Sequence, residues 1–259
     1  MERIAYEACP VCQSKNFEEI RKGYVKDHTS WVKGGETFIH WMQCGSCGHV
    51  FTNGYLSPEG LAGMVKKAHM VQTPGWDPEK ARLFAGRTVE VVQLQQTTTG
   101  RRWLDVGCGD GSLLGFVQEC GYKAHGIDIR PENVALLQAA GLDVEEIDFM
   151  EYPEGKLYDV VSMRDVIEHL PSPQLALEKA RRLVCGGGLL VISTPSREAL
   201  PWKLPRPNGE NPYWVELEHC HQFSADGLRQ LLENAGFDQV HARPGMHYRV
   251  TIEIIARRR

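Results

Sequence analysis

The sequence predicts an α/β protein with a mostly parallel sheet, preceded by a small cysteine-rich module. From Arg101 onward, apolar runs of strand length alternate with segments of helical spacing. Such alternation is typical of a parallel sheet with helices on both faces. Before it, four of the eight cysteines form two Cys-x-x-Cys pairs. We therefore expect three parts: a cysteine-rich module at 1–54, a helical linker or cap at 55–99 and an α/β domain at 100–259.

Length and composition limit the broad class of protein. The chain has 259 residues, of which 42% are hydrophobic, and a formal net charge of −4. No apolar run approaches the roughly 18 residues of a membrane span, and the first residues do not form a signal peptide. We therefore expect a cytoplasmic protein without a membrane partner. The acidic charge offers no global attraction for nucleic acid, and the basic run 257–259 is expected to be a solvated terminus. The sequence does not indicate an oligomeric state.

The first element is a candidate zinc module. A Cys-x-x-Cys turn places two thiolates side by side, and two such turns complete a tetrahedral site of four cysteines. A strand at 38–43 can lead into the second turn, and the metal would supply folding free energy that so small a core lacks. The spacing predicts a zinc-ribbon-like module with one structural zinc ion, with two redox or unpaired turns as the alternative. The predicted ligands are Cys9, Cys12, Cys44 and Cys47.

Two helices are expected in the linker. Ser57-Pro58 and Asp77-Pro78 each place proline directly after a residue that commonly caps a helix. The second helix has apolar residues on one face, so it can pack either over a ligand pocket or on the edge of the sheet.

The α/β domain opens with a glycine turn between a strand and a helix. The strand is Leu104–Val106, and apolar residues at helical spacing continue up to Gly121. Glycines between a strand and a helix let a ligand lie against bare backbone at the helix N-terminus. The glycines have the pattern Gly-x-Gly-x-Gly, and the third glycine of a dinucleotide motif would fall on Ser112.

Two acidic residues identify the ligand of this turn. Asp105 lies two residues before the first glycine, where it would repel a pyrophosphate but attract an ammonium or sulfonium group. Asp128 ends the next strand, where a carboxylate can bind two ribose hydroxyls. A ligand with a cationic amino-acid end and a ribose is S-adenosylmethionine (SAM).

These residues resemble the first two motifs of class I SAM-dependent methyltransferases, in the methyltransferase type 11/23 group, and the resemblance continues to residue 257. Residues 148–149 are similar to the pair that contacts adenine, 158–170 to the fourth strand and the loop beside the reactive methyl, and 186–195 to the turn into the fifth strand. The resemblance implies a Rossmann-like sheet whose last strand is antiparallel, and SAM as cofactor. The implied SAM-binding residues are Asp105, Gly107, Cys108, Gly109, Gly111, Asp128, Ile129, Asp148, Phe149 and Arg164.

The segment after the fourth strand is the first candidate for acceptor chemistry. His169 titrates in the range of a general base, so it is a candidate base or substrate-orienting residue; the alternative is a residue that packs or caps a helix start. Asp165, Glu168 and His169 also resemble the Glu-x-x-Glu-His pattern with which some relatives bind a divalent metal, with Asp165 in place of the first glutamate. Use of a second metal stays an alternative.

The second candidate is the long segment 201–223, which begins as a proline-rich loop. A long loop inside a compact domain is more often functional than not, and in the resembling family this position supplies the substrate pocket. A purely structural flap is the alternative. The candidate substrate residues are Trp202, Tyr213, Trp214, His219 and His221.

The sequence thus predicts in-line methyl transfer from SAM to a small molecule or glycan precursor, with O-methylation and His169 as base favoured. RNA methylation is one alternative, because the cysteine-rich module carries several lysines and arginines and could dock on RNA. A non-catalytic SAM-binding protein is another. The atom that accepts the methyl group is not determined by the sequence.

Overall fold

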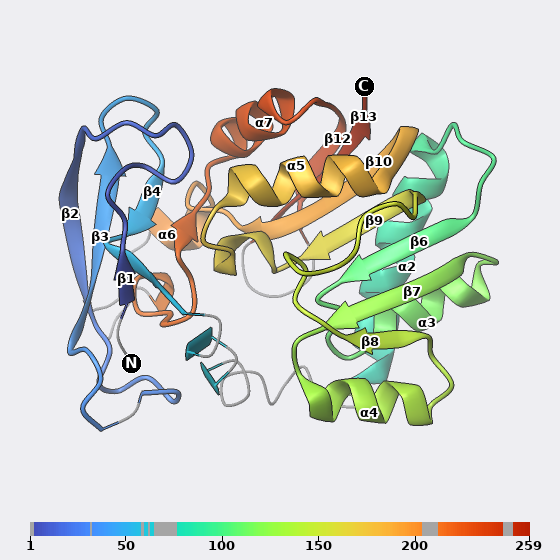
Figure 1. Ribbon diagram of the computed structural model, residues 1–259, viewed down its shortest axis with the longest axis horizontal. Coiled ribbons are helices and arrows are strands. Elements are labelled where there is room, and N and C mark those ends of the chain that lie inside the picture. Colours follow the sequence, from blue (N-terminus) through green and yellow to red (C-terminus); the bar gives the residue numbers. More distant parts are fainter. Residues whose placement is uncertain are drawn as a thin grey trace.

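The computed structural model describes residues 3–31, 33–57, 60–61, 63–64, 77–203, 212–245 and 251–259. A small antiparallel module lies on one side and a larger α/β domain on the other (Figure 1). The helix predicted to begin at 57–59 lies largely outside the described residues.

The α/β domain is built on a seven-stranded sheet with the order β12-β13-β10-β9-β6-β7-β8. Neighbouring strands are parallel from β10 to β8, whereas β13 runs antiparallel to both β10 and β12. This confirms the predicted sheet with its antiparallel last strand. The strands are β6 (Arg102–Val106), β7 (Lys123–Asp128), β8 (Val144–Glu146), β9 (Tyr158–Arg164), β10 (Val184–Pro195), β12 (Phe237–Pro244) and β13 (Thr251–Arg258).

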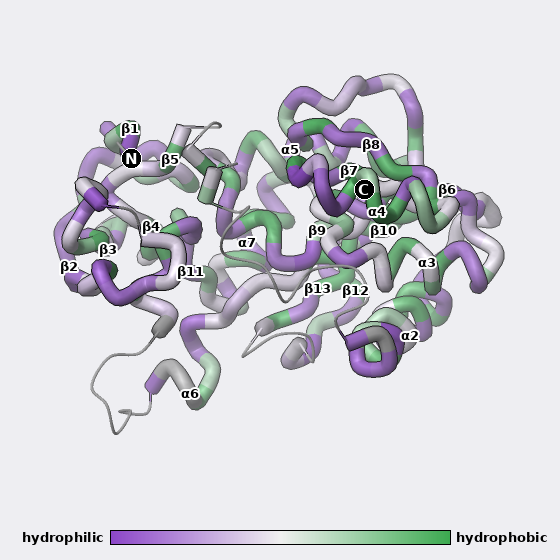
Figure 2. The backbone as a smooth tube through the Cα atoms, turned by 90° about the horizontal axis from the view of Figure 1, so that it is seen from below, coloured by the Kyte–Doolittle hydropathy of each residue, from purple (hydrophilic) through white to green (hydrophobic). Residues whose placement is uncertain are grey.

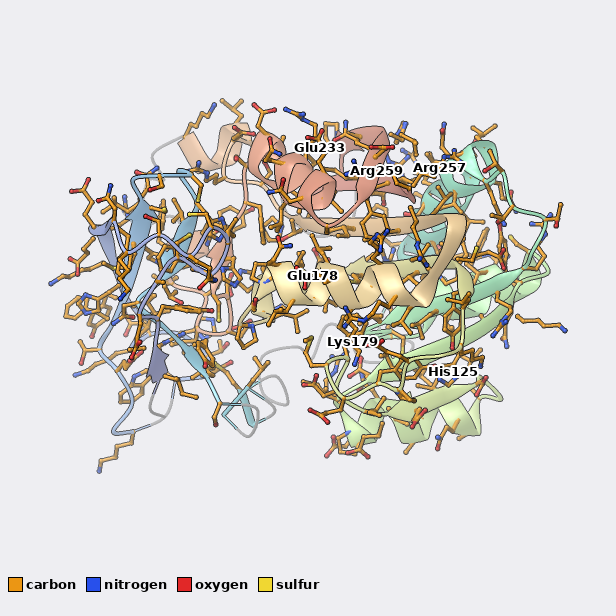
Figure 3. All side chains as sticks on the ribbon, turned by 45° about the horizontal axis from the view of Figure 1, so that its top comes forward. His125, Glu178, Lys179, Glu233, Arg257 and Arg259 are labelled. Atoms are coloured by element: carbon orange, nitrogen blue, oxygen red, sulfur yellow. The ribbon has the colours of Figure 1, made fainter. Side chains whose placement is uncertain are left out.

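Helices cover both faces of this sheet, because the strands are apolar on both sides. On one face α2 (Pro78–Gln95), α3 (Ser112–Glu119) and α4 (Pro131–Ala139) pack against one set of strand residues, which includes Trp103 and Val191. On the other face α5 (Pro173–Leu183) and α7 (Ala225–Asn234) pack against the alternate set, which includes Leu104 and Ile192. Lys179 of α5 donates a hydrogen bond to the carbonyl of Met150 (2.6 Å), which ties α5 to the loop after β8 (Figure 3).

The helices begin at residues whose side chains cap the first turn, and three of them end at glycines. Asp77, Ser172 and Ser224 each accept a hydrogen bond from the first turn of α2, α5 and α7, and proline follows the first two caps. At the other end, the glycines that follow α3, α4 and α7 all have positive φ, which confirms the predicted stops at these residues. They are Gly121, Gly141 and Gly236.

The N-terminal module has two small antiparallel sheets. One pairs β1 (Arg3–Ala5) with β5 (Gly54–Leu56), and the other contains β2 (Phe17–Tyr24), β3 (Phe38–Cys44) and β4 (Val50–Thr52). The strand expected at 38–43 is thus confirmed. The second sheet gains a fourth strand, β11 (His221–Gln222), from the far end of the sequence, and β11 lies beside β4 (Figure 2). The sheet of the module is therefore completed by the α/β domain.

The segment after β10 joins the two parts. It contains α6 (Leu200–Lys203), η3 (Pro212–Trp214) and β11. The N–H of Cys220 donates to the carbonyl of Glu168 (2.8 Å), and the carbonyl of Cys220 accepts from the N–H of Thr52 (2.9 Å). A Cβ on Gly23 of β2 would lie 1.9 Å from the carbonyl oxygen of Trp214, so this contact requires glycine. Residues 212–223 are thus held between the module and the carboxyl ends of the parallel strands.

The basic C-terminal run is only partly the solvated terminus that the sequence predicts: Arg257 and Arg258 end β13 and are half-buried, whereas Arg259 is exposed. Arg257 donates to the carbonyl of Gln95 (2.8 Å), and the N–H of Arg259 donates to the carbonyl of Gly236 (3.1 Å) (Figure 3). Arg257 and Arg258 are half-buried because β13 lies between β12 and β10 in the sheet. Among the described residues, no helix has both the length and the apolar character that crossing a bilayer requires.

Candidate functional site

A cavity of about 300 Å³ lies at the carboxyl ends of β6, β7 and β9. Open α/β sheets present ligands at this edge. The cavity contains the glycine turn and its two acids, and it continues to η2 (Ile167–His169), the segment 212–223 and the loop between β2 and β3. The described residues thus place both predicted candidate regions around one cavity.

The glycine turn requires glycine for two separate reasons. The φ angles of Gly107, Gly109 and Gly111 are +64°, +59° and +74°, a region that side chains disfavour. A Cβ on Gly107 would also lie 2.6 Å from Val166 Cγ2, and one on Gly111 would lie 2.4 Å from Leu137 Cδ2. Packing and backbone conformation therefore keep the turn bare, so that a ligand can approach the backbone.

A carboxylate and a guanidinium lie at one end of the cavity. Asp105 is 3% exposed, and Ser162 Oγ donates to its Oδ1 (2.6 Å). Burial raises the pKa of Asp105 to about 6, although the nearby Arg164 opposes this shift. Arg164 Nη1 is buried with no hydrogen-bond partner among the described residues. The ammonium and carboxylate of an amino acid fit this pair, so these residues can hold the methionyl end of SAM.

The acid at the end of β7 is bound by an arginine that the sequence prediction missed. Asp128 Oδ1 accepts from the N–H and Nε of Arg130, and Oδ2 accepts from Arg130 Nη2 and the N–H of Gly109, each at 2.9 Å. These four hydrogen bonds fill the acceptor positions of a carboxylate. A ribose can therefore use Asp128 only if it replaces some of these contacts. The available signal was Arg130 itself, two residues after the strand end.

Most of the other residues predicted to bind SAM also line this cavity. Phe149 is 4% exposed, and the N–H of Met150 donates to Asp148 Oδ1 (2.6 Å), which fixes the loop after β8. Gly111 does not line the cavity but begins α3 as its N-cap. The predicted residues that line it are Asp105, Gly107, Cys108, Gly109, Asp128, Ile129, Asp148, Phe149 and Arg164.

His169 lies at the other end of the cavity in a defined orientation. Its Nδ1 is 3.1 Å from the carbonyl oxygen of Glu218. Because a carbonyl only accepts, Nδ1 carries the hydrogen and Nε2 has the lone pair. Burial lowers the pKa of His169, which favours the neutral ring. The arrangement can therefore supply a general base.

Glu168 and His219 lie beside His169. Glu168 is 1% exposed; its Oε2 accepts from Thr194 Oγ1 (2.9 Å), while Oε1 has no partner among the described residues. One ligand atom from each of Glu168, His169 and His219 lies within 4.8 Å of the others. The sequence grouped Asp165 rather than His219 with this pair. Asp165 instead has a φ of +53° and accepts from Ser193 Oγ (3.4 Å).

Of the candidate substrate residues, His219 lines the cavity, whereas Tyr213, Trp214 and His221 are not among its described lining. The Trp214 ring packs edge-on against Trp41 of the module, with 5.5 Å between the ring centres, and His221 Nδ1 lies 3.1 Å from His49 Nε2 of the module. These rings face the module because β11 pairs with β4. The side chain of Trp202 lies outside the described part of the chain.

We call the end of the cavity around His169 and His219 the acceptor end. The sequence analysis did not predict three residues that line it. Glu216 and Glu218 lie within the candidate segment 201–223 but were not among its predicted substrate residues, and their alternate spacing was the available signal. His28 comes from the N-terminal module, and no local pattern marks it.

The four predicted zinc ligands form a cluster. Cys9 Sγ lies 3.7 Å from Cys47 Sγ, and Cys12 Sγ lies 3.5 Å from Cys44 Sγ. Tetrahedral zinc with Zn–S bonds of about 2.3 Å requires sulfur separations of about 3.8 Å. The N–H of Ser46 points at Cys44 Sγ (3.4 Å), which favours a thiolate. The cluster therefore fits a single zinc ion.

The strand order, the glycine turn, the acid on β6 and the acid that ends β7 define a class I SAM-dependent methyltransferase. The chain belongs to the family described as "Methyltransferase domain", which matches residues 78–242. This match begins with α2, inside the segment that the sequence prediction treated as a linker.

Curated relatives and solved structures agree with this assignment. The chain is 30% identical over 146 residues to a ubiquinone biosynthesis O-methyltransferase of Bordetella bronchiseptica, a match that covers 51% of this chain and 61% of the relative. It is 28% identical over 209 residues to the enzyme of that name from Leptothrix cholodnii, covering 74% and 87%. The chain thus spans about three fifths of the first of these relatives.

Among solved structures, the fold is similar to a 1,6-didemethyltoxoflavin-N1-methyltransferase of Burkholderia thailandensis, with a TM-score of 0.59 and 16% identity over 81% of this chain and 95% of that one. It is also similar to a magnesium protoporphyrin IX methyltransferase of Synechocystis, with a TM-score of 0.55 and 18% identity over 70% and 84%. At these identities the structures support the fold alone.

Proposed function

We propose that this protein transfers a methyl group from SAM to a hydroxyl group of a small molecule or glycan precursor, with His169 as the general base. The observation that carries this proposal is the orientation of His169: its Nδ1–H is held by the Glu218 carbonyl, which leaves Nε2 as a base in the cavity that contains the SAM motifs. The curated relatives are named as O-methyltransferases, which supports the same reaction class.

In this proposal one end of the cavity binds SAM and the other end removes the proton of the acceptor hydroxyl. Bound SAM supplies a methyl group on a good leaving group. Asp105 holds the ammonium of its methionyl end, and Arg164 holds the carboxylate. As the acceptor oxygen attacks the methyl carbon in line, His169 Nε2 takes the hydroxyl proton. The Glu218 carbonyl keeps the ring oriented and stabilises the imidazolium that forms.

We further propose one structural zinc ion per chain at the four-cysteine cluster. The sulfur separations support a tetrahedral site, and the small module buries little apolar surface by itself. In this role the ion stabilises the module and takes no part in methyl transfer.

RNA methylation is less well supported. The described residues that line the acceptor end of the cavity include carboxylates and imidazoles but no lysine or arginine. Recognition of RNA depends on cationic groups that neutralise phosphates.

Labelling tests the proposed function directly. The protein is incubated with methyl-labelled SAM and a cell extract, which is then separated into small molecules, glycans, RNA and protein. We expect label in small molecules or glycans, in an ether-type methyl group that mass spectrometry identifies, and suppression of labelling by S-adenosylhomocysteine (SAH). Label mainly in RNA would contradict the proposal, and SAM binding without transfer to any pool would favour a non-catalytic role.

The affinity for SAM is expected to depend on pH through Asp105. The carboxylate must be ionised to attract the ammonium group, and its pKa in the free protein is raised to about 6. The dissociation constant of SAM should therefore be nearly constant above pH 7 and rise by up to about tenfold per unit as pH falls below 6. Titration calorimetry at several pH values measures this.

The matched variant is Asp105→Asn. It should bind SAM about 10- to 100-fold more weakly at pH 8, because it loses a charged hydrogen bond, and its affinity should not fall further near pH 6. An unchanged pH dependence in this variant would show that another group is responsible.

A further inference from the structure

Arg130 forms an ion pair with Asp128 inside the cavity, and methyl transfer as described above does not use it. Arg130 lies two residues after Asp128 and is the N-cap residue of α4. The side chain of Arg130 is 9% exposed and that of Asp128 is 3% exposed, and both residues line the cavity. The pair therefore lies among the residues predicted to bind SAM rather than on the outer surface.

Two of the four donors on Asp128 belong to the backbone, and the other two belong to one side chain. The N–H of Gly109 donates to Oδ2 and the N–H of Arg130 to Oδ1, each at 2.9 Å. Arg130 Nε donates to Oδ1 and Nη2 to Oδ2, also at 2.9 Å. The two side-chain bonds can be given up without a change in the glycine turn or in the start of α4.

These two side-chain donors are arranged as a ribose diol would be. A guanidinium places one N–H on each oxygen of a carboxylate. The 2′- and 3′-hydroxyls of a ribose are likewise two neighbouring donors, and the acid that ends β7 is predicted to bind them. The guanidinium and the diol therefore compete for the same two acceptor positions on Asp128.

The guanidinium also covers part of the bare glycine turn. A Cβ on Gly109 would lie 3.6 Å from Arg130 Nη2, which is an ordinary van der Waals distance. The backbone of this turn is the surface that a ligand is expected to approach. Arg130 thus occupies both the acceptor atoms for a ribose and the space beside them.

Asp110 offers a second acidic partner to the guanidinium. It follows Gly109 in the turn and lines the cavity. Burial lowers the pKa of Arg130, but the hydrogen bonds and charge of Asp128 raise it overall, and the charge of Asp110 acts in the same direction. A rotation of the Arg130 side chain away from Asp128 can therefore leave its positive charge near another carboxylate.

We propose that Arg130 is an internal competitor of the cofactor ribose, and that SAM binds by displacing its guanidinium from Asp128. This inference concerns cofactor binding, rests on the predicted role of Asp128 and does not involve the methyl acceptor. The apparent affinity for a ligand is reduced by the fraction of protein in which its site is closed, so the ion pair lowers the affinity for SAM. In return, the pair compensates a buried carboxylate until the ribose replaces the arginine.

NMR of the Arg130 Nε–H group in the full-length protein tests the displacement directly. The signal is assigned by its absence in Arg130→Lys, and a buried ion pair should make its exchange with solvent slow. We expect SAH and 5′-methylthioadenosine, which both contain the ribose, to shift this signal and to accelerate its exchange. Methionine, which fits only the end at Asp105 and Arg164, should leave it unchanged. An unchanged signal with bound SAH, or release by methionine alone, would overturn the proposal.

Variants measure the effect of the competition on affinity. Arg130→Met removes the charge and the side-chain donors, so the dissociation constants of SAH and 5′-methylthioadenosine at pH 8 should each fall about tenfold, whereas that of methionine should not change. Arg130→Lys keeps the charge but cannot donate to both oxygens in the bidentate manner, so its effect should be smaller. Unchanged or weaker binding of SAH in both variants would also overturn the proposal.

Arg82→Met is the matched control. Arg82 forms a bidentate pair of the same kind with Glu119, but both side chains are exposed and neither residue is among the described lining of the cavity. This variant should leave all three dissociation constants unchanged, as measured by calorimetry.

Thermal unfolding separates an effect on folding from an effect on binding. Loss of its counter-charge leaves Asp128 uncompensated, so Arg130→Met should melt at a lower temperature than the wild type, and saturating SAH should raise its melting temperature by more. An equal or smaller effect of SAH in the variant would contradict competition. The NMR experiment uses the wild type and stays decisive if a variant folds poorly.

Discussion

Replacement of His169 by glutamine is expected to lower kcat by about 10²- to 10⁴-fold, which is the usual contribution of a general base. Glutamine is polar and similar in size, but it cannot accept the hydroxyl proton. The residues predicted to bind SAM lie at the other end of the cavity, on β6, β7 and β9 and in the loop after β8, so the dissociation constant of SAM should not change. Steady-state kinetics with an identified acceptor and calorimetry with SAM measure the two quantities.

The pH profile gives a further test of this role. Only the neutral imidazole accepts a proton, and burial lowers the pKa of His169. In the wild type, kcat/KM should therefore remain high to a pH below the usual range of histidine and then fall as the ring becomes protonated. The residual activity of His169→Gln should lack this acidic limb.

His125 provides a matched control. It lies on β7 between Asp143 and Glu145 and does not line the cavity (Figure 3). His125→Gln should retain wild-type kcat and the wild-type pH profile. If His169→Gln also retained full activity, His169 would have no part in proton transfer.

Loss of zinc is expected to abolish acceptor turnover while SAM binding is preserved. Structural zinc sites contribute about 10–16 kcal/mol of binding free energy that is also folding free energy, so a module without its ion should unfold. The segment 212–223 depends on the module: β11 pairs with β4, and Trp41 Nε1 donates to the carbonyl of Trp214 (2.9 Å). This segment contains the carbonyl of Glu218 that orients His169. Unfolding of the module should therefore disorder the acceptor end.

The variant Cys44→Ser tests this dependence, with Cys185→Ser in the α/β domain as the control. Elemental analysis should find one zinc ion per chain in the wild type and in Cys185→Ser, and little in Cys44→Ser. In Cys44→Ser, kcat/KM for the acceptor should fall by at least about 100-fold, and hydrogen exchange at 212–223 should become fast, while SAM affinity stays within about threefold. A folded, active wild type without zinc, or equal loss of SAM affinity in the variant, would contradict the prediction.

Local sequence patterns were sufficient for much of the molecule. The glycine turn, the acid on β6 and the acid that ends β7 lie within one strand–helix–strand unit, so their proximity follows from short connections. The two cysteine pairs could also be predicted from local sequence, since each Cys-x-x-Cys turn fixes two sulfur atoms and the strand β3 leads to the second turn. The alternation of strands and helices was sufficient to predict the fold class. Strands that are apolar on both faces, as β13 and the parallel strands are, must be covered by helices on both sides.

The tertiary structure decided which side chains face the acceptor end of the cavity. Residues 213–223 contain aromatic rings, histidines and glutamates. From the local pattern alone, either the aromatic rings or the glutamates could face a ligand. Where β11 pairs with β4, Trp214 and His221 contact Trp41 and His49 of the module, whereas Glu216, Glu218 and His219 line the cavity.

The same dependence explains the residues that sequence reasoning missed or grouped differently. His28 and Glu216 are far apart in the chain, and Glu168 groups with His219 rather than with Asp165, three residues away. Contacts of this kind arise from strand pairing between the module and the α/β domain, which spacing along a single chain does not encode. The sequence by itself determined the fold class and the SAM motifs. The packing of the N-terminal module against the α/β domain determined the chemistry of the acceptor end, because that packing selects which face of residues 212–223 is buried against protein and which remains at the cavity.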